Sequence, residues 1–324
     1  MLKTLKFTPE NYSDWDEFVL ITRRENVFSL SGWVKPLSGL NNSEVCIIGI
    51  SEGGSIIAGL AGVISGTYGI RIFEPPLLSP YNGIIIDPSV TESKDQIEAY
   101  KLLLDNIKPL CDRLIIQFYP GISPVETKPA YGLKSTERFT SFVDLSANGS
   151  LRSGFKADIK NKINKAERSG ISVVEDFNPA ELHRLLELVY NKAGLKSRWN
   201  EDPFYSALKA IQQEGWLQIW FSVKDDRYVA GTAIVIRDDT AYSWLSATDP
   251  EYYKLGAGPK LISDTLQQLS NQAVKHFDFM GVNIPSVGRY KEAFGGERVT
   301  FASQDYVFSI KGRLYRALQD RLKR

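Results

Sequence analysis

One order of predicted elements occurs twice in the 324 residues, and it constrains the fold more than any other feature. The second half predicts a strand at 171–175, two helices, a meander of three strands, a helix at 260–274 and two further strands. The first half predicts the same order between residues 3 and 145. Apolar residues alternate along the strands and recur every three to four positions along the helices. A repeated order of this kind indicates a duplicated α/β unit.

The sequence predicts two tandem domains, 1–149 and 150–310, followed by a C-terminal helix at 311–324. Strand alternation changes to a helical period at Ser150, which we take as the boundary, and the chain is long enough for two hydrophobic cores. Leu314, Leu318 and Leu322 lie at helical spacing in the tail, among six cations. A basic amphipathic helix of this type is able to make peripheral contact with an anionic membrane.

Composition excludes several classes of function. The chain has 39 Lys and Arg residues against 38 Asp and Glu residues, so its net charge of +1 gives no reason to expect DNA as a partner. Two His and two isolated Cys argue against a metal site and against a His-activated nucleophile. Acid–base chemistry would then fall to Asp, Glu, Tyr, Lys or a substrate amine. We expect a cytoplasmic protein, because no signal peptide or membrane-spanning run is evident.

The segment 277–297 is the main candidate for a functional site. Its first residues alternate as a strand, Gly281 ends that strand, and a short helix follows at 286–294. Ligands of α/β proteins usually bind at the carboxyl ends of strands. The segment would bring four polar side chains to such an end: Asp278, Arg289, Tyr290 and Lys291. The alternative is a surface turn followed by a basic helix.

Two motifs resemble the FemAB-like branch of the GNAT acyltransferase superfamily, which comprises the peptidoglycan-bridge aminoacyltransferases and their relatives. The first is the strand with Asp278 and Gly281, followed by Lys291 just before Phe-Gly-Gly. The second is the basic helix from Phe155 to Ile171, with its Ala-Glu-x-x-Gly ending. The resemblance covers the whole chain. It implies an α/β (α+β) fold of two tandem GNAT-like acyl-CoA N-acyltransferase domains, each a mixed central sheet flanked by helices.

The resemblance also implies roles for three candidate catalytic residues. In the family, the Lys that matches Lys291 lies beside the acyl donor, where an ammonium favours the oxyanion of the reaction. Asp278 would orient the attacking amine or accept its proton. Tyr242 matches a Tyr that lines the acceptor channel, although a core aromatic is an equal alternative.

Further residues are candidates for substrate binding. Arg198 matches an Arg that contacts the phosphates of a sugar-nucleotide acceptor, a contact that suits a guanidinium. Trp33 and Lys35 resemble the family's Trp followed by a phosphate-binding Lys. Arg289 and Tyr290 would bind substrate beside Lys291. Surface charge is the alternative for each cation.

The turn before the 260–274 helix resembles the coenzyme A pyrophosphate turn of GNAT acetyltransferases. Its residues are Leu255, Gly256, Ala257 and Gly258. Helix N-termini attract anions, and Gly allows close approach of the backbone. Tyr253 stands where the family pattern has Arg or Gln, and Pro259 lacks an N–H. The basic helix at 152–168 either binds phosphates of tRNA or a nucleotide, or is a solvated face.

These features together predict an acyltransferase with no tightly bound cofactor. It would move an aminoacyl or acyl group to an amine of a nucleotide- or lipid-linked cell-envelope precursor, of peptidoglycan or surface polysaccharide. The donor would be aminoacyl-tRNA, with the tRNA acceptor end as a partner, or acyl-CoA. A coenzyme-A-dependent N-acyltransferase and a catalytically degenerate GNAT pair that only binds are the alternatives. The family also implies that the 311–324 helix packs on the first domain. The region 156–216 is too short for the long helical arm of typical bridge enzymes.

Overall fold

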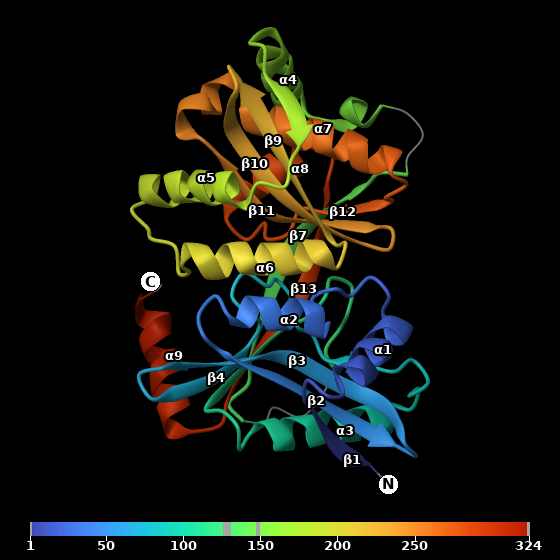
Figure 1. Ribbon diagram of the computed structural model, residues 1–324. Helices are drawn as coiled ribbons and strands as arrows, with labels where there is room; N and C mark the ends of the chain where they lie inside the picture. Colours follow the sequence, from blue (N-terminus) through green and yellow to red (C-terminus); the bar gives the residue numbers. More distant parts are fainter. Residues whose placement is uncertain (1, 126–130, 147–149, 323–324) are drawn as a thin grey trace. The chain divides into compact units, whose positions relative to one another are not determined.

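The computed structural model describes residues 2–125, 131–146 and 150–322. The chain divides into two units, which are labelled by element in Figure 1. Unit 1 contains residues 1–138 and 300–324, and unit 2 contains residues 139–299. Each unit has a mixed sheet with helices on both faces.

Unit 1 has the strand order β1-β2-β3-β4-β6-β13, in which only the pair of β4 and β6 is parallel. A short strand, β5, pairs with β3. Helix α1 packs directly on the sheet, because a Cβ at Gly59 would lie 2.3 Å from the Trp15 ring. The elements are β1 (Lys3–Phe7), α1 (Tyr12–Thr22), α2 (Ser31–Ser38), β2 (Glu44–Glu52), β3 (Ser55–Thr67), β4 (Ile70–Glu74), β5 (Ile85–Ile86), α3 (Ser93–Ile107), β6 (Arg113–Gln117) and, from the C-terminal part of the chain, β13 (Glu297–Val307).

Unit 2 has the strand order β7-β12-β11-β10-β9-β8, in which only the pair of β11 and β12 is parallel. Gly231 of β10 faces Leu185 of α5, whereas its neighbour Ala230 packs with Leu261 of α7, so these helices cover opposite faces. The elements are β7 (Lys134–Asp144), α4 (Ala157–Arg168), β8 (Ser172–Glu175), α5 (Pro179–Lys192), α6 (Glu201–Gln213), β9 (Leu217–Lys224), β10 (Arg227–Arg237), β11 (Thr240–Thr248), α7 (Ala257–Asn271), β12 (His276–Asp278) and α8 (Pro285–Glu292), with 3-10 turns at Leu151–Gly154 and Pro250–Leu255.

The repeated element order is present, but each sheet is completed by a strand from the other half of the sequence. Residues 142–144 of β7 pair with β12 in unit 2, and residues 303–307 of β13 pair with β6 in unit 1. The units therefore do not follow the linear division at 149/150, and residues 147–149 lie outside the described part. The assignment of duplicated domains to 1–149 and 150–310 stays a prediction.

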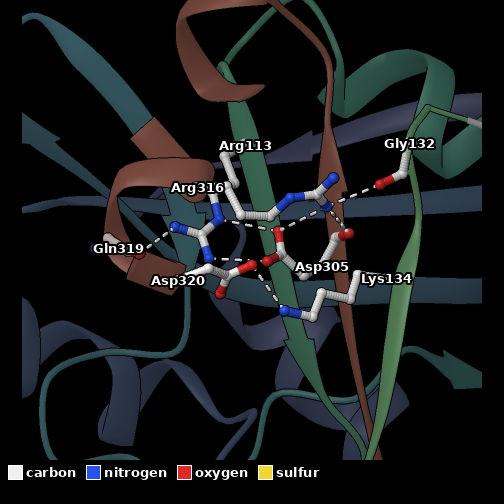
Figure 2. Close-up of polar contacts among 7 residues, drawn as sticks. All are labelled: Arg113, Gly132, Lys134, Asp305, Arg316, Gln319 and Asp320. Atoms are coloured by element: carbon white, nitrogen blue, oxygen red, sulfur yellow. Dashed lines mark hydrogen bonds and ion pairs between the residues drawn. The ribbon is translucent and has the colours of Figure 1, made fainter. Parts of the chain in front are cut away.

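Helix α9 (Ile310–Leu322) belongs to unit 1. Its polar side chains bond with residues of β6, β7 and β13 in that unit (Figure 2). Of the predicted 311–324 helix, residues 323–324 and the side chain of Leu322 lie outside the described part. Among the described residues, no helix is long and apolar enough to cross a bilayer.

Candidate active site in unit 2

The parallel strands β11 and β12 pair over only three positions, from Thr240 with His276 to Tyr242 with Asp278. Strand β12 then ends, whereas β11 continues to Thr248. The chain after β12 turns sharply at Met280 and Gly281, which have φ angles of 52° and 48°. The edge of β11 beyond Tyr242 is therefore left without its parallel neighbour.

A pocket of about 510 Å³ lies at this edge of β11. Its apolar lining comes from Val189, Trp244, Leu261, Ile262, Phe279 and Val287. Its polar lining comes from Lys162, Ser243, Ser246, Thr248, Tyr253, Tyr290 and Lys291. A mainly apolar pocket with a few polar groups is typical of a small-molecule site.

Lys291 of α8 lines the pocket, and its ammonium is held by the backbone after β12. The Nζ atom donates to the carbonyl oxygens of Phe279 at 2.8 Å, Met280 at 2.5 Å and Gly281 at 3.4 Å. Burial lowers the pKa of Lys291 to about 8, and the nearby charge of Asp278 opposes that shift. The ammonium thus fixes the turn that forms one wall of the pocket, and it titrates close to neutral pH.

Asp278 is fully buried and does not line the pocket. Its Oδ1 accepts from Thr140 Oγ1 and, at 2.7 Å, from the N–H of Met280. The period of two along a strand puts Phe277 and Phe279 on one side and Asp278 on the other. The structure therefore gives Asp278 a positioning contact with the left-handed Met280, and its predicted contact with the attacking amine stays a prediction.

The first turn of α7 reaches the pocket through Gly258 and Pro259. Gly256 has a φ of 82°, and a Cβ there would lie 2.3 Å from the carbonyl oxygen of Lys162 in α4. This close approach brings the basic helix α4 against the N-terminus of α7, with Lys162 in the lining. Ala257 is buried, and its carbonyl accepts from Ser222 Oγ at 3.0 Å.

Hydroxyl groups surround the same helix start. A Cβ at Gly258 would lie 2.7 Å from Thr248 Oγ1 and 3.4 Å from Tyr290 Oη. Burial raises the pKa of Tyr290, so its hydroxyl keeps its proton at neutral pH. The first N–H groups of a helix have no partner within the helix, and they favour an anion. Together with Lys162, this end of the pocket is suited to a phosphate.

Lys162 and Thr248 were missed by sequence reasoning. The basic helix carried a signal for Lys162, but the spacing alone did not distinguish it from the other cations. Two of the cations at 152–168 are in ion pairs: Arg152 with Glu167 at 2.8 Å, and Lys162 itself with Asp158, an exposed carboxylate one turn earlier, at 3.5 Å. These pairs support the solvated-face interpretation for much of the helix.

Several predicted residues lie outside the pocket lining. Tyr242 is buried on β11, two residues before Trp244, which does line it. Arg198 and Arg289 are exposed in unit 2, and Leu255 ends the turn before Gly256 without lining the pocket. Their binding roles stay predictions.

Trp33 and Lys35 belong to α2 of unit 1. Trp33 is fully buried, and its Nε1 donates to Ser79 Oγ at 3.1 Å. Lys35 is exposed. Trp33 therefore serves the core of its unit, and a role in substrate binding stays a prediction for both residues. In the described part of the chain, no group of three His, Cys, Asp or Glu residues is arranged to hold a metal ion.

Residues 153–292 match a family model described as an acetyltransferase (GNAT) domain. This segment contains the pocket, Lys291 and the turn before α7. Most of unit 2 therefore matches the GNAT domain family. None of the curated proteins compared with the chain matches it significantly.

Solved structures agree with the GNAT fold over nearly the whole chain. FemX has a TM-score of 0.64 at 12% identity, over 97% of this chain and 99% of its own. A tandem GNAT protein from the clavulanic acid biosynthesis pathway has a TM-score of 0.61 at 12% identity, over 95% of this chain and 99% of its own. The C-terminal domain of a putative lysylphosphatidylglycerol synthetase from Agrobacterium fabrum has a TM-score of 0.57 at 14% identity, over 97% of this chain and 95% of its own. The predicted tandem GNAT fold is confirmed, and FemX is among the structures that share it.

Proposed function

We propose that the chain transfers an acyl or aminoacyl group from an activated donor to an amine of a cell-envelope precursor. The observation that carries this proposal is the pocket beside β11, which joins an apolar wall to the N-terminus of α7. A donor such as aminoacyl-tRNA or acyl-CoA combines an acyl group with a phosphate-bearing nucleotide. The two ends of the pocket suit these two parts.

The acyl group would lie along Trp244 and Phe279, with the phosphate toward Gly258 and Lys162. The amine attacks the carbonyl carbon of the donor, the bond to the leaving oxygen or sulfur breaks, and the proton lost by the amine ends on that leaving atom. Lys291 would contribute positive charge beside the reacting carbonyl. Because its donors already bond three backbone carbonyls, its effect combines electrostatics with positioning of Phe279.

The acceptor class rests on the fold of FemX and of the putative lysylphosphatidylglycerol synthetase. Their names connect this fold with the cell envelope, and aminoacyl transfer to such precursors uses an amine or hydroxyl acceptor. A nucleotide-linked precursor of peptidoglycan or surface polysaccharide is the proposed substrate, and the cytoplasm is the proposed compartment. Arg198 is the proposed contact to its phosphates.

The turn at Gly256 and Gly258 favours a second candidate, an N-acyltransferase that depends on coenzyme A. The match of residues 153–292 to an acetyltransferase (GNAT) domain also favours this candidate. Pro259 lacks an N–H, which leaves the helix N-terminus one donor fewer for a pyrophosphate. The two candidates share the pocket and differ in the donor.

Mass spectrometry of the acceptor tests the proposal. The purified protein is incubated with a UDP-linked muropeptide and either alanyl-tRNA or acetyl-CoA. We expect an amide product that carries the donor's acyl mass, and a loss of about 100-fold in rate for Lys291→Met. Product with acetyl-CoA alone would favour the second candidate. A chain that binds donor and acceptor but forms no product would be the degenerate binding pair, and the proposal would be wrong.

A further inference from the structure

Helix α9 of unit 1 directs its apolar side chains outward. Ile310, Leu314 and Leu318 are 76%, 66% and 55% exposed. Residues four apart lie on the same face of a helix, so these three side chains form one stripe. A surface helix normally buries its apolar stripe, and the reverse arrangement indicates a surface that another body covers.

Polar side chains hold the inner face of α9. Arg113 of β6 donates to both carboxylate oxygens of Asp305, at 2.9 and 2.8 Å, and to Gln319 Oε1 at 2.6 Å. Arg316 Nη1 donates to the carbonyl oxygens of Gly132 at 2.8 Å and Asp305 at 3.1 Å. Figure 2 shows these groups pointing toward one another. The orientation of the helix is therefore fixed by its polar side.

Both ends of α9 are also attached. Ser309 caps its start, where Ser309 Oγ donates to Asp112 Oδ1 and accepts from the N–H of Gly312 at 3.1 Å. A Cβ at Gly312 would lie 2.4 Å from the carbonyl oxygen of Asp112, so the helix lies flush on the unit there. Near the other end, Lys134 Nζ donates to Asp320 Oδ2 at 2.8 Å.

The charge on the outer face has one sign. Lys311, Arg313 and Arg321 are exposed beside the apolar stripe. The acidic residue of the helix, Asp320, is paired with Lys134 on the inner side. A symmetric contact between two copies of α9 would bring like charges together, which disfavours a second copy as the occupant.

We propose that the outer face of α9 docks on the surface of an anionic lipid bilayer. A helix of 13 residues is about 20 Å long, which is too short to span a bilayer. It would lie in the plane of the interface, with the apolar stripe between the acyl chains and the cations among anionic headgroups. This proposal does not depend on the acyl donor or on the pocket in unit 2.

Vesicle co-sedimentation of the full chain tests the proposal. We expect binding to vesicles of phosphatidylcholine and phosphatidylglycerol at 3:1, and binding weaker by about tenfold or more to pure phosphatidylcholine. Salt at 0.5 M should weaken the binding, because it screens the cations. Absence of binding to the anionic vesicles, or equal binding to both compositions, would overturn the proposal.

Variants assign the effect to α9. The double variant Leu314→Glu/Leu318→Glu should lose at least about tenfold in vesicle affinity, since it places carboxylates on the inserted stripe. Ile21→Glu is the matched control, because Ile21 is an exposed aliphatic of α1 at 73%. Circular dichroism should be unchanged for both. Unaltered vesicle binding of the double variant would contradict the proposal. The proposal would also be contradicted if the wild type formed a dimer in sedimentation velocity but bound no vesicles, and if the double variant alone lost that dimer.

Discussion

At the scale of single residues, Lys291 and Asp278 are two opposite charges that hold the turn at Met280 from either side. The ammonium binds the carbonyls of the turn, and the carboxylate binds its N–H. Met280 adopts a left-handed φ that costs a non-Gly residue about 1 kcal/mol. These contacts from both sides keep it there, and Phe279 stays in the pocket wall.

The pH dependence of catalysis should report the charge of Lys291. The pKa of Lys291 is about 8, so kcat should fall as pH rises through 8 and the ammonium is lost. Asp278→Asn removes a charge that raises this pKa, so the fall should move to lower pH. Asp226→Asn makes the same charge change in an exposed turn and should leave the profile in place. If Asp278→Asn had the same pH profile as the wild type, the titration of Lys291 would not be the cause of the fall in kcat.

The same pKa affects stability. Lys291 binds a proton more weakly in the folded chain than in the unfolded chain, whose pKa is near 10.5. Between pH 8 and 10.5 the unfolded state therefore binds more protons, and stability gains as pH rises. Relative to Lys291→Met, the wild type should gain about 2–3 kcal/mol between pH 7 and pH 10. Urea unfolding of both proteins at the two pH values measures the difference, and a constant difference would contradict the buried ammonium.

At the scale of elements, the turn between β11 and α7 depends on Gly256. Gly256→Ala would combine an unfavourable left-handed φ with a Cβ 2.3 Å from the backbone of Lys162. We expect a loss of about 2–4 kcal/mol, of which about 1 kcal/mol is the backbone term. Gly215→Ala is the control, since Gly215 has a φ of 76° and open space around it. In thermal melts, Gly256→Ala should have a lower Tm than Gly215→Ala. Equal losses of stability would mean that α4 moves away from the new Cβ without a cost in free energy, which would contradict the prediction.

Particular residues show what the sequence was able to predict. Spacing and resemblance singled out Lys291 and Gly258, and both line the pocket of unit 2. Alternation along β12 already implied that Asp278 and Phe279 point to opposite sides. Lys162 was out of reach, since its place depends on how α4 packs against Gly256. The exchanged strands β7 and β13 were also out of reach, because strand pairing between distant segments leaves no local pattern.

At the scale of the whole molecule, unit 1 is closed by the C-terminal part of the chain. Asp305 of β13 holds Arg113, which is 8% exposed in its side chain. Asp305→Ala would leave that charge buried without its partner, at a cost of about 3–5 kcal/mol. Hydrogen exchange should quicken in β6 and α9 more than in α7, because each unit has its own core. Glu44→Ala, which breaks an exposed pair with Arg71, should change little. Equal acceleration in both units would contradict this division.

The central claim is that the pocket beside β11 holds an activated acyl donor with its phosphate at the start of α7. The most direct test is isothermal titration with acetyl-CoA and with a non-hydrolysable 3′-aminoacyl-adenosine 5′-phosphate. Each ligand is titrated into the wild type and into Gly258→Val, whose side chain would press against Thr248 and Tyr290 at the start of α7. We predict that at least one ligand binds the wild type, and that it binds the variant at least about tenfold more weakly. Binding that the variant leaves unchanged, or no binding of either ligand, would contradict the account.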